Sequence, residues 1–166
     1  NPLLVSVRSG APVSMPGMMD TILNLGFNDY VAQKMLDITG DEEFVYSSYL
    51  RFVQMFSEIT EGIDRKRFTE LKSDNYKDQI NEGKQIYKNE CGKDFPENFE
   101  EQIFYAVKAI FESWNNDRAI LYRKLNNIDN NMGTAVIIQE MVFGNLNEKS
   151  GTGVLFTRNP STGEDK

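Results

Sequence analysis

The sequence of 166 residues has no histidine, one cysteine and one tryptophan, and its apolar runs are short. Without histidine there is no imidazole to activate a nucleophile, so Cys91 has no catalytic partner. Cys91 also cannot form a disulfide within the chain, and we expect a half-buried helix residue in a reducing compartment, the cytoplasm. No apolar run approaches the roughly 20 residues that a membrane span needs, and nothing resembles a signal peptide, so we expect no membrane partner.

The charge balance excludes one class of partner and leaves another open. Eighteen basic residues stand against 25 acidic ones, which gives a net charge of −7. A nucleic-acid surface needs a basic face, so we expect no nucleic-acid partner. A nucleotide is different, because a few local arginines and lysines can hold its phosphates within an acidic protein. With 40% hydrophobic and 26% charged residues, the composition is that of a globular domain.

The first 21 residues combine a buried strand with a loop that suits a phosphate group. A short β-branched run leads to Arg8, and the loop that follows is built from Gly10, Pro12, Pro16 and Gly17. Glycine lets the backbone approach an anion, proline stiffens the loop, and amide N–H groups beside an arginine can hold phosphate oxygens. An ordinary surface turn with an exposed arginine is the alternative, since the glycine spacing fits neither a dinucleotide fingerprint nor a Walker loop.

The middle of the chain is predicted to be helical. Apolar residues recur at intervals of three and four, with Asn, Asp and Gly at cap positions. An aromatic-rich stripe within residues 41–59 predicts core rather than a cofactor contact. Mixed charges in residues 63–74 predict a solvated helix rather than a binding patch. The predicted helices span residues 28–40, 41–59, 63–74, 76–91, 99–114 and 117–125, the last capped by Asp117 and carrying Ile120, Leu121 and Leu125.

Beyond a turn-rich break at residues 126–133, the pattern changes to strands. Residues 134–142 and 152–157 are typical of two strands joined by a glycine-containing loop, which predicts an antiparallel hairpin. Residues 21–26 fit either a short strand or a helical turn. We expect the β pieces at the two ends of the chain to share a sheet, with the helices inserted between them.

Two long stretches resemble the pyruvate phosphate dikinase family. The first includes Ser-Val-Arg-Ser-Gly-Ala from Ser6 and Ser-Met-Pro-Gly-Met-Met-Asp-Thr from Ser14. The second includes Gln-Glu-Met-Val-Phe-Gly-Asn from Gln139 and Thr-Arg-Asn-Pro-Ser-Thr-Gly-Glu from Thr157, and shorter matches lie at residues 111–114 and 117–118. The resemblance covers the chain end to end and implies part of an ATP-grasp-like nucleotide-binding domain.

The predicted fold class is α+β, a predominantly helical block inserted between β pieces of an ATP-grasp-like domain, incomplete at both ends. We expect three parts: residues 1–28 as the strand and nucleotide-binding loop, residues 29–127 as a helical subdomain, and residues 128–166 as a β hairpin of the adenine-binding lobe. The chain enters almost directly into a strand and stops just after a loop, so we expect a fragment of something larger.

The resemblance implies an enzyme in which ATP and inorganic phosphate are used to phosphorylate a histidine on another domain, before pyruvate is converted reversibly to phosphoenolpyruvate. With no histidine and no pyruvate site, this chain would not turn over alone, and the phosphohistidine domain would belong to the same parent chain. ATP, phosphate and pyruvate are the expected small-molecule partners, and the parent is expected to be a homo-oligomer. The alternatives are the same domain of a phosphoenolpyruvate synthase-type enzyme, or a non-catalytic helical interaction module.

The resemblance implies that Arg8 is the catalytic residue and binds the ATP phosphates, with a structural ion pair as its alternative. Loop contacts to the nucleotide are expected from Gly10, Ser14, Gly17 and Thr21. Asp20 could approach a metal, but capping is the favoured role. The loop methionines are expected to pack against the protein, and Pro12 stands where the family leads us to expect a basic residue.

The adenine side is expected on the second matched stretch, at Gln139, Glu140, Met141 and Val142, because a strand can offer backbone groups to the adenine edge. For Glu140 a solvent-facing position is the alternative. Arg158 could reach the phosphates or close its own loop. Mg²⁺ is expected to accompany ATP, but we assign no metal ligand within the chain.

Overall fold

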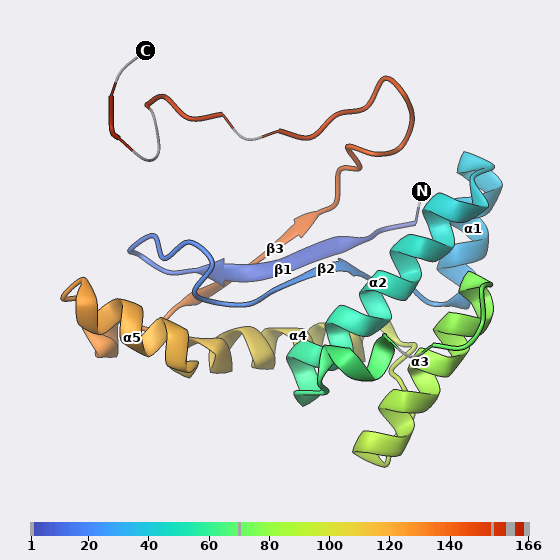
Figure 1. The fold of residues 1–166 in the computed structure, drawn as a ribbon, viewed down its shortest axis with the longest axis horizontal. Helices are drawn as coiled ribbons and strands as arrows, with labels where there is room; N and C mark the ends of the chain where they lie inside the picture. The colour runs from blue at the N-terminus through green and yellow to red at the C-terminus, as the bar shows by residue number, and fades with distance from the viewer. Residues whose placement is uncertain (1, 70, 154, 159–161, 165–166) are drawn as a thin grey trace.

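The computed structural model describes residues 2–69, 71–153, 155–158 and 162–164 (Figure 1). These residues form five α-helices and a three-stranded antiparallel sheet, which confirms the predicted α+β class. Figure 1 shows the helices on one side of the sheet and the chain that follows the last strand on the other. Within this described part, no helix has both the length and the hydropathy that a membrane crossing requires.

The sheet joins the two ends of the chain, with strand β1 (Val5–Gly10) in the centre between β2 (Thr21–Leu25) and β3 (Ala135–Glu140). Arg8 is paired with Thr21 on one side and with Ile137 on the other. The prediction that the terminal β pieces share a sheet is therefore confirmed, and residues 21–25 form a strand rather than a helical turn. Arg8 lies inside β1 rather than at its end, because the pairing continues to Gly10.

Five α-helices connect β2 to β3: α1 (Asp29–Thr39), α2 (Glu42–Glu61), α3 (Tyr76–Cys91), α4 (Phe99–Glu112) and α5 (Asp117–Leu125). Short 3-10 turns lie at η1 (Arg65–Phe68), η2 (Ser113–Asn115) and η3 (Asn130–Met132). The sequence predicts Asn28 or Asp29 as the cap of α1 and Asp41 as the cap of α2, and the caps are Asn28 and Asp41. The Asn28 and Asp41 side chains accept hydrogen bonds of 2.8 Å from the N–H groups of Val31 and Phe44.

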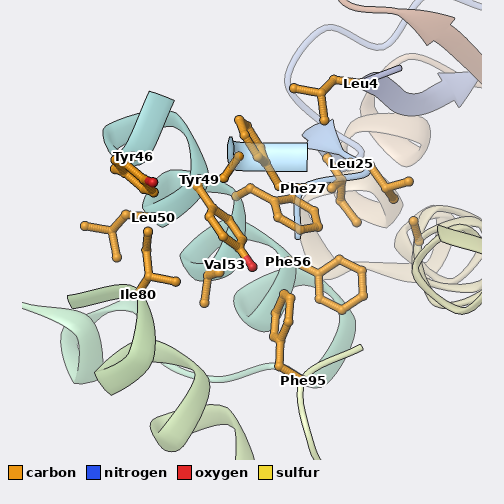
Figure 2. Packing of buried hydrophobic residues seen from close by; sticks show 14 of the residues in the cluster. Leu4, Leu25, Phe27, Tyr46, Tyr49, Leu50, Val53, Phe56, Ile80 and Phe95 are labelled. Carbon is orange, nitrogen blue, oxygen red and sulfur yellow. The ribbon is translucent and has the colours of Figure 1, made fainter. Parts of the chain in front are cut away.

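One apolar cluster joins the helices to the sheet (Figure 2). The rings of Phe27 and Tyr49 are stacked with 5.1 Å between centroids, and Phe56 lies fully buried on the same helix as Tyr49. Val7 and Leu25 from the sheet belong to this cluster. Burying a side chain of this size contributes about 1.5–3 kcal/mol. The aromatic stripe of α2 is thus core, as predicted, and is not available as a partner surface.

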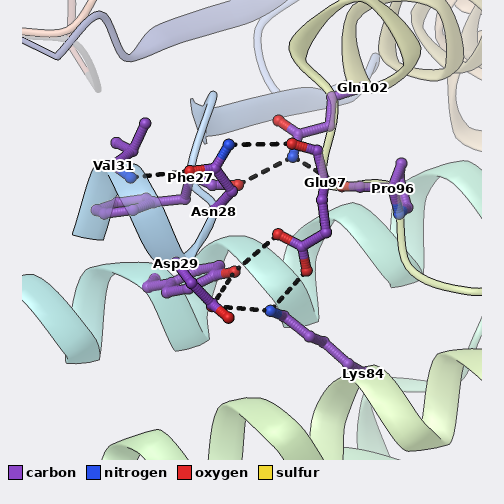
Figure 3. Close-up of polar contacts among 9 residues, drawn as sticks. Phe27, Asn28, Asp29, Val31, Lys84, Pro96, Glu97 and Gln102 are labelled. Atoms are coloured by element: carbon purple, nitrogen blue, oxygen red, sulfur yellow. Dashed lines mark hydrogen bonds and ion pairs between the residues drawn. The ribbon is translucent and has the colours of Figure 1, made fainter. Parts of the chain in front are cut away.

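A buried glutamine fixes the turn between β2 and α1 against α4 (Figure 3). Gln102 accepts from the Gly26 N–H at 2.9 Å and donates to the carbonyls of Phe27 and Pro96 at 2.9 and 2.8 Å. Because a buried amide without partners is costly, these three bonds specify one docking of α4 on the sheet. The apolar stripe predicted for this helix did not include Gln102.

Residues 63–74 were predicted as a solvated helix, and this is wrong: within the described residues only Arg65–Phe68 is helical. Phe68 is buried, whereas the three charged residues before it, Arg65, Lys66 and Arg67, are exposed. Ile63 and Phe68 are both buried, but they are five residues apart and would lie on different faces of one helix. Helices of this length gain most of their stability from burying a single apolar face.

The last helix also differs from its prediction. Its N-cap residue is Asn116, and Asp117 is the first helical residue. The side chains of Ala119 and Arg123 are buried, whereas Ile120, Leu121 and Leu125 are exposed. The reason is that the Arg123 guanidinium lies 4.1 Å from the Trp114 ring and donates to the Trp114 carbonyl, which turns the apolar residues outward.

Of the predicted hairpin, only the first strand forms within the described residues. Residues 152, 153 and 155–157 have no strand, Leu155 is 93% exposed, and residue 154 lies outside the described part. Here the segment buries too little apolar surface to offset the entropy of ordering it. The division of the chain at residues 28 and 127 stays a prediction.

Candidate functional site

The two faces of the sheet have different chemistry. Side chains alternate along a strand, so Val5 and Val7 enter the core with 4% and 0% exposure. Arg8, the next residue, is exposed on the outer face, where Thr21 and Ile137 lie beside it in the register. The β-strand period thus places one arginine at the centre of a sheet face that is not covered by any helix of the described residues (Figure 1).

The guanidinium of Arg8 is directed by a glutamine from the other end of the chain. Its Nη2 atom donates to Oε1 of Gln139 at 2.5 Å. Gln139 is opposite Ser6, whose hydroxyl donates to the Gln139 carbonyl at 3.3 Å. The structure therefore brings together Arg8 from the predicted phosphate set and Gln139 from the predicted adenine set.

The loop between β1 and β2 contains a tight turn at Pro16 and Gly17. The Met18 N–H donates to the Met15 carbonyl at 3.1 Å, and Gly17 has φ = 72°. Proline followed by a residue of positive φ is the signature of a type II turn. A side chain at Gly17 would be strained in this conformation although the space around it is open.

Arg8 and the loop enclose a hollow of about 480 Å³. Its lining includes all five residues expected at the phosphates, namely Arg8, Gly10, Ser14, Gly17 and Thr21. At the end of the hollow next to β1, the Gly10 N–H donates to the Thr134 hydroxyl at 3.2 Å. This amide therefore already has a partner within the protein. The hollow is open, polar and bordered by a cation, which suits an anionic ligand.

The middle of the loop is anchored by a second apolar cluster. The Met15 side chain, 6% exposed, packs with Trp114 and Ala119, and Met18 and Met19 lie partly buried against them. This confirms that the loop methionines pack against the protein. The exposed residues of the loop are therefore presented from a fixed base.

Asp20 at the end of the loop is held by the corner between α4 and α5. Its carboxylate accepts from Asn116 Nδ2 at 2.9 Å and pairs with the Arg118 guanidinium. Its N–H donates to the Ser113 hydroxyl at 3.3 Å. Both carboxylate oxygens are thus bound by side chains of this corner, which favours a structural role for Asp20 over a metal ligand. The role differs from the capping that was expected, because the partners are side chains and not backbone N–H groups.

Comparison with known proteins agrees with this geometry. The model of the family described as "Pyruvate phosphate dikinase, AMP/ATP-binding domain" matches residues 1–166. The chain belongs to this family.

A pyruvate, phosphate dikinase of Clostridium symbiosum is 49% identical over 181 residues, which cover 99% of this chain and 21% of that protein. One from Giardia intestinalis is 51% identical over 99% of this chain and 20% of the relative. A chloroplastic one from Mesembryanthemum crystallinum is 48% identical, with 99% and 19% covered. The chain spans about a fifth of the length of these relatives.

The remaining residues of the predicted adenine set are not gathered around Arg8. Glu140 is exposed at the end of β3, which agrees with its solvent-facing alternative. Met141 is half-buried against the core and donates its N–H to the Leu4 carbonyl at 2.9 Å. Val142 is 90% exposed. These residues belong to the end of the edge strand and the segment after it, and their contact with adenine stays a prediction.

Arg158 lies in the extended segment after β3 and is not among the residues that line the hollow. Its predicted contact with the phosphates stays a prediction. Among the described residues, no group of three or more His, Cys, Asp and Glu side chains is placed to hold a metal ion. Asp20 is the one carboxylate of the loop, and it is already paired. The loop therefore does not fit a protein-held magnesium ion, and we derive no step through one.

The thiol of Cys91 is separate from this site, at the end of α3. It is half-buried, as predicted, and burial together with the Glu61 carboxylate raises its pKa. Such a thiol is a poor nucleophile at neutral pH.

Sequence reasoning missed the role of the residues that hold the loop: Ser113, Asn116, Arg118 and Thr134. The resemblance pointed to residues 111–114 and 117–118 without giving a reason for them. The structure supplies one, because these positions form the corner on which Met15 and Asp20 rest. Their signal in the sequence is weak, since polar contacts across 93 or more positions leave no periodicity.

Proposed function

We propose that this chain binds the phosphates of ATP in the hollow formed by Arg8 and the loop of residues 9–21. The observation that carries the proposal is the position of Arg8, which is exposed at the centre of the outer sheet face, directed by Gln139 and adjacent to an anchored glycine–proline loop. A guanidinium offers two parallel N–H donors to phosphate oxygens, and its charge cannot be lost at neutral pH.

The chemistry would be phosphoryl transfer from ATP to a histidine. In such a transfer negative charge spreads over the phosphate oxygens, and a fixed cation that meets it lowers the barrier. Arg8 is the residue of this chain placed to do so. The chain has no histidine, so the acceptor would be supplied by another domain of a pyruvate phosphate dikinase. That domain, inorganic phosphate and pyruvate are the partners of the proposed whole enzyme.

Three further expectations belong to this proposal. Magnesium would arrive with the nucleotide, bound mainly through phosphate oxygens. The adenine would lie toward β3, where Gln139 and the residues after it end the sheet. The cytoplasmic location and the homo-oligomeric state stay predictions from the sequence and its resemblance.

Two alternatives were open from the sequence. The family description and the three relatives carry the dikinase name, which favours a pyruvate phosphate dikinase over a phosphoenolpyruvate synthase-type enzyme. Two aromatic-rich stripes could form the surface of a helical interaction module. The stripe of α2 is buried in the core, which disfavours this alternative, whereas Phe111 in the stripe of α4 is 49% exposed.

Calorimetry of the whole protein with a non-hydrolysable ATP analogue and Mg²⁺ tests the proposal. Arg8→Ala is expected to weaken binding by about 10- to 100-fold, because a charge-assisted hydrogen-bond pair contributes about 1.5–3 kcal/mol. The control is Arg65→Ala, which removes an exposed arginine from η1, an element that contacts α2 and α3. Equal affinity in Arg8→Ala and the wild type would remove Arg8 from the nucleotide site.

A further inference from the structure

The pair formed by Arg118 and Asp20 joins the proposed nucleotide loop to α5. The guanidinium pairs with one carboxylate oxygen of Asp20, and its Nε donates to the Met18 carbonyl at 3.0 Å. One side chain thus ties down two positions of the loop. The Arg118 side chain is 52% exposed and that of Asp20 is 22% exposed, so the pair lies at the surface, outside the core.

The contacts converge on the end of the loop that leads into β2. Thr21, directly after Asp20, lines the hollow and lies opposite Arg8 in the sheet. Met19 and Gly17, on either side of Met18, also line it. A movement at Asp20 or Met18 would therefore move the surface that faces the ligand.

Without this pair the loop would retain only part of its support. Met15 is buried against Trp114, and the Gly10 N–H bonds to Thr134. Between Met15 and Thr21, the described contacts that bridge to the rest of the protein come from the α4–α5 corner. Ordering a loop on binding costs affinity, so fixing it beforehand strengthens binding without a new contact to the ligand.

We propose that Arg118 is a positioning residue for the nucleotide: it holds the end of the loop at Met18 and Asp20 so that the loop faces the phosphates before ATP arrives. This proposal rests on the function proposed above. Arg118 acts through the loop and not by touching the nucleotide. Lysine in its place can pair with Asp20 but cannot also bind the Met18 carbonyl in fork geometry.

The test compares Arg118→Ala and Arg118→Lys with a matched control, Arg67→Ala. Arg67 forms a two-contact pair with Glu90, at 3.0 and 2.8 Å, with side chains 59% and 42% exposed, between η1 and α3. In the whole protein, Arg118→Ala is expected to weaken ATP-analogue binding about tenfold, because the entropy lost on ordering the loop then lowers the free energy gained on binding. Arg118→Lys should lie between Arg118→Ala and the wild type, and Arg67→Ala should bind as the wild type does.

Two further readouts separate positioning from general destabilisation. The melting temperatures of Arg118→Ala and Arg67→Ala should fall by similar small amounts, because exposed pairs contribute little to stability. Hydrogen exchange in residues 11–19 should accelerate in Arg118→Ala only. In a double-mutant cycle, Asp20→Ala combined with Arg118→Ala should lose little more affinity than either change alone, because both break the same tie.

The outcomes distinguish this proposal from the one on which it rests. If Arg8→Ala loses affinity while Arg118→Ala binds as tightly as the wild type, the nucleotide site stands and the positioning role is wrong. Unchanged exchange in residues 11–19 would also overturn the positioning role. If the wild type does not bind the analogue, both proposals fail together.

Discussion

The inner and outer faces of the three-stranded sheet differ in chemistry although they share one backbone. On the inner face, Val7, Ile22 and Leu25 have no exposed surface and pack with the helices. On the outer face, Arg8 and Gln139 form a polar pair beside Ile137, which is 43% exposed. The inner face accounts for stability, and the outer face carries the proposed function.

This difference follows from the period of two along a strand. A position next to a core residue belongs to the same paired strand, yet its side chain faces outward. Arg8 follows the buried Val7 in β1 and is paired with Thr21 on β2 and Ile137 on β3, but its own side chain is exposed. The comparison shows that strand pairing can position a cationic side chain on an exposed face when its residue alternates along the strand with core residues.

The largest expected effect is on stability, from Ile22→Ala on the inner face. Removing a fully buried isoleucine side chain costs about 2–5 kcal/mol in free energy of unfolding. The matched change on the outer face, Ile137→Ala, is expected to cost about 1 kcal/mol or less because that side chain is partly exposed. Urea unfolding of the two variants measures both values, and equal losses would contradict the division between the faces.

Two tyrosines on the helical side of the core, Tyr49 and Tyr87, should make the free energy of unfolding depend on pH. Burial, with the carboxylates of Glu97 and Asp29, raises the pKa of Tyr49 above its ordinary value of 10.0, and burial with Glu61 raises that of Tyr87. The unfolded tyrosines lose their protons first, so this contribution is complete below pH 10 and is lost as the pH rises. The free energy of unfolding is expected to fall by up to about 1.4 kcal/mol per pH unit for each tyrosine.

Unfolding experiments between pH 9 and 11 measure this slope. Tyr49→Phe and Tyr87→Phe should each reduce it, whatever they do to stability at neutral pH. A slope that is the same in both variants and in the wild type would show that the two phenols do not titrate differently on unfolding.

A smaller effect is expected from Gly17→Ala in the loop above the outer face. The left-handed φ of 72° costs a non-glycine residue about 1–2 kcal/mol. Gly151→Ala is the control, because that glycine has open space around it and no positive φ. Gly17→Ala should lower the melting temperature and the affinity for the ATP analogue, whereas Gly151→Ala should change neither. Equal behaviour of the two variants would mean that the turn is not rigid.

The smallest expected effect on stability is that of Arg8→Ala. Its side chain is exposed, and an exposed polar contact such as that with Gln139 contributes about 0.5 kcal/mol or less to folding. The same change is expected to cause the largest loss of nucleotide affinity. Thermal unfolding and calorimetry on one sample compare the two quantities, and a strongly destabilised Arg8→Ala variant would place Arg8 among the structural residues.

The five α-helices and the caps of α1 and α2 could be predicted because their signals are local. Asn28, Asp41 and Gly40 lie within a few residues of the groups they bind, and the stripe of α2 repeats every three to four residues. The strand at residues 21–25 was ambiguous because so short an apolar run fits either a strand or a helical turn. In the structure its pairing with β1 is irregular, and Asn24 adopts φ = 59°. The predicted buried face of α5 was wrong because the side chain that packs on the Trp114 ring is that of Arg123 and not an aliphatic one.

The site was predictable in part. Arg8 and the loop residues were identified by resemblance, and the structure places them around one hollow. The link from Arg8 to Gln139 and the tie from Asp20 to Arg118 could not be predicted, because they join positions 131 and 98 residues apart. Such contacts depend on how the elements pack, and no local pattern encodes them.

Hydrogen exchange of the whole protein, with and without the ATP analogue and Mg²⁺, tests the central claim most directly. We predict slower exchange in peptides that cover residues 9–21 and 134–140, which border Arg8 on both sides. The contrasting region is the smaller pocket of about 250 Å³ between α1, α2 and α3, lined by Asp29, Tyr46 and Lys77 among others. Protection confined to that pocket, with residues 9–21 unchanged, would contradict a nucleotide site on the outer face of the sheet.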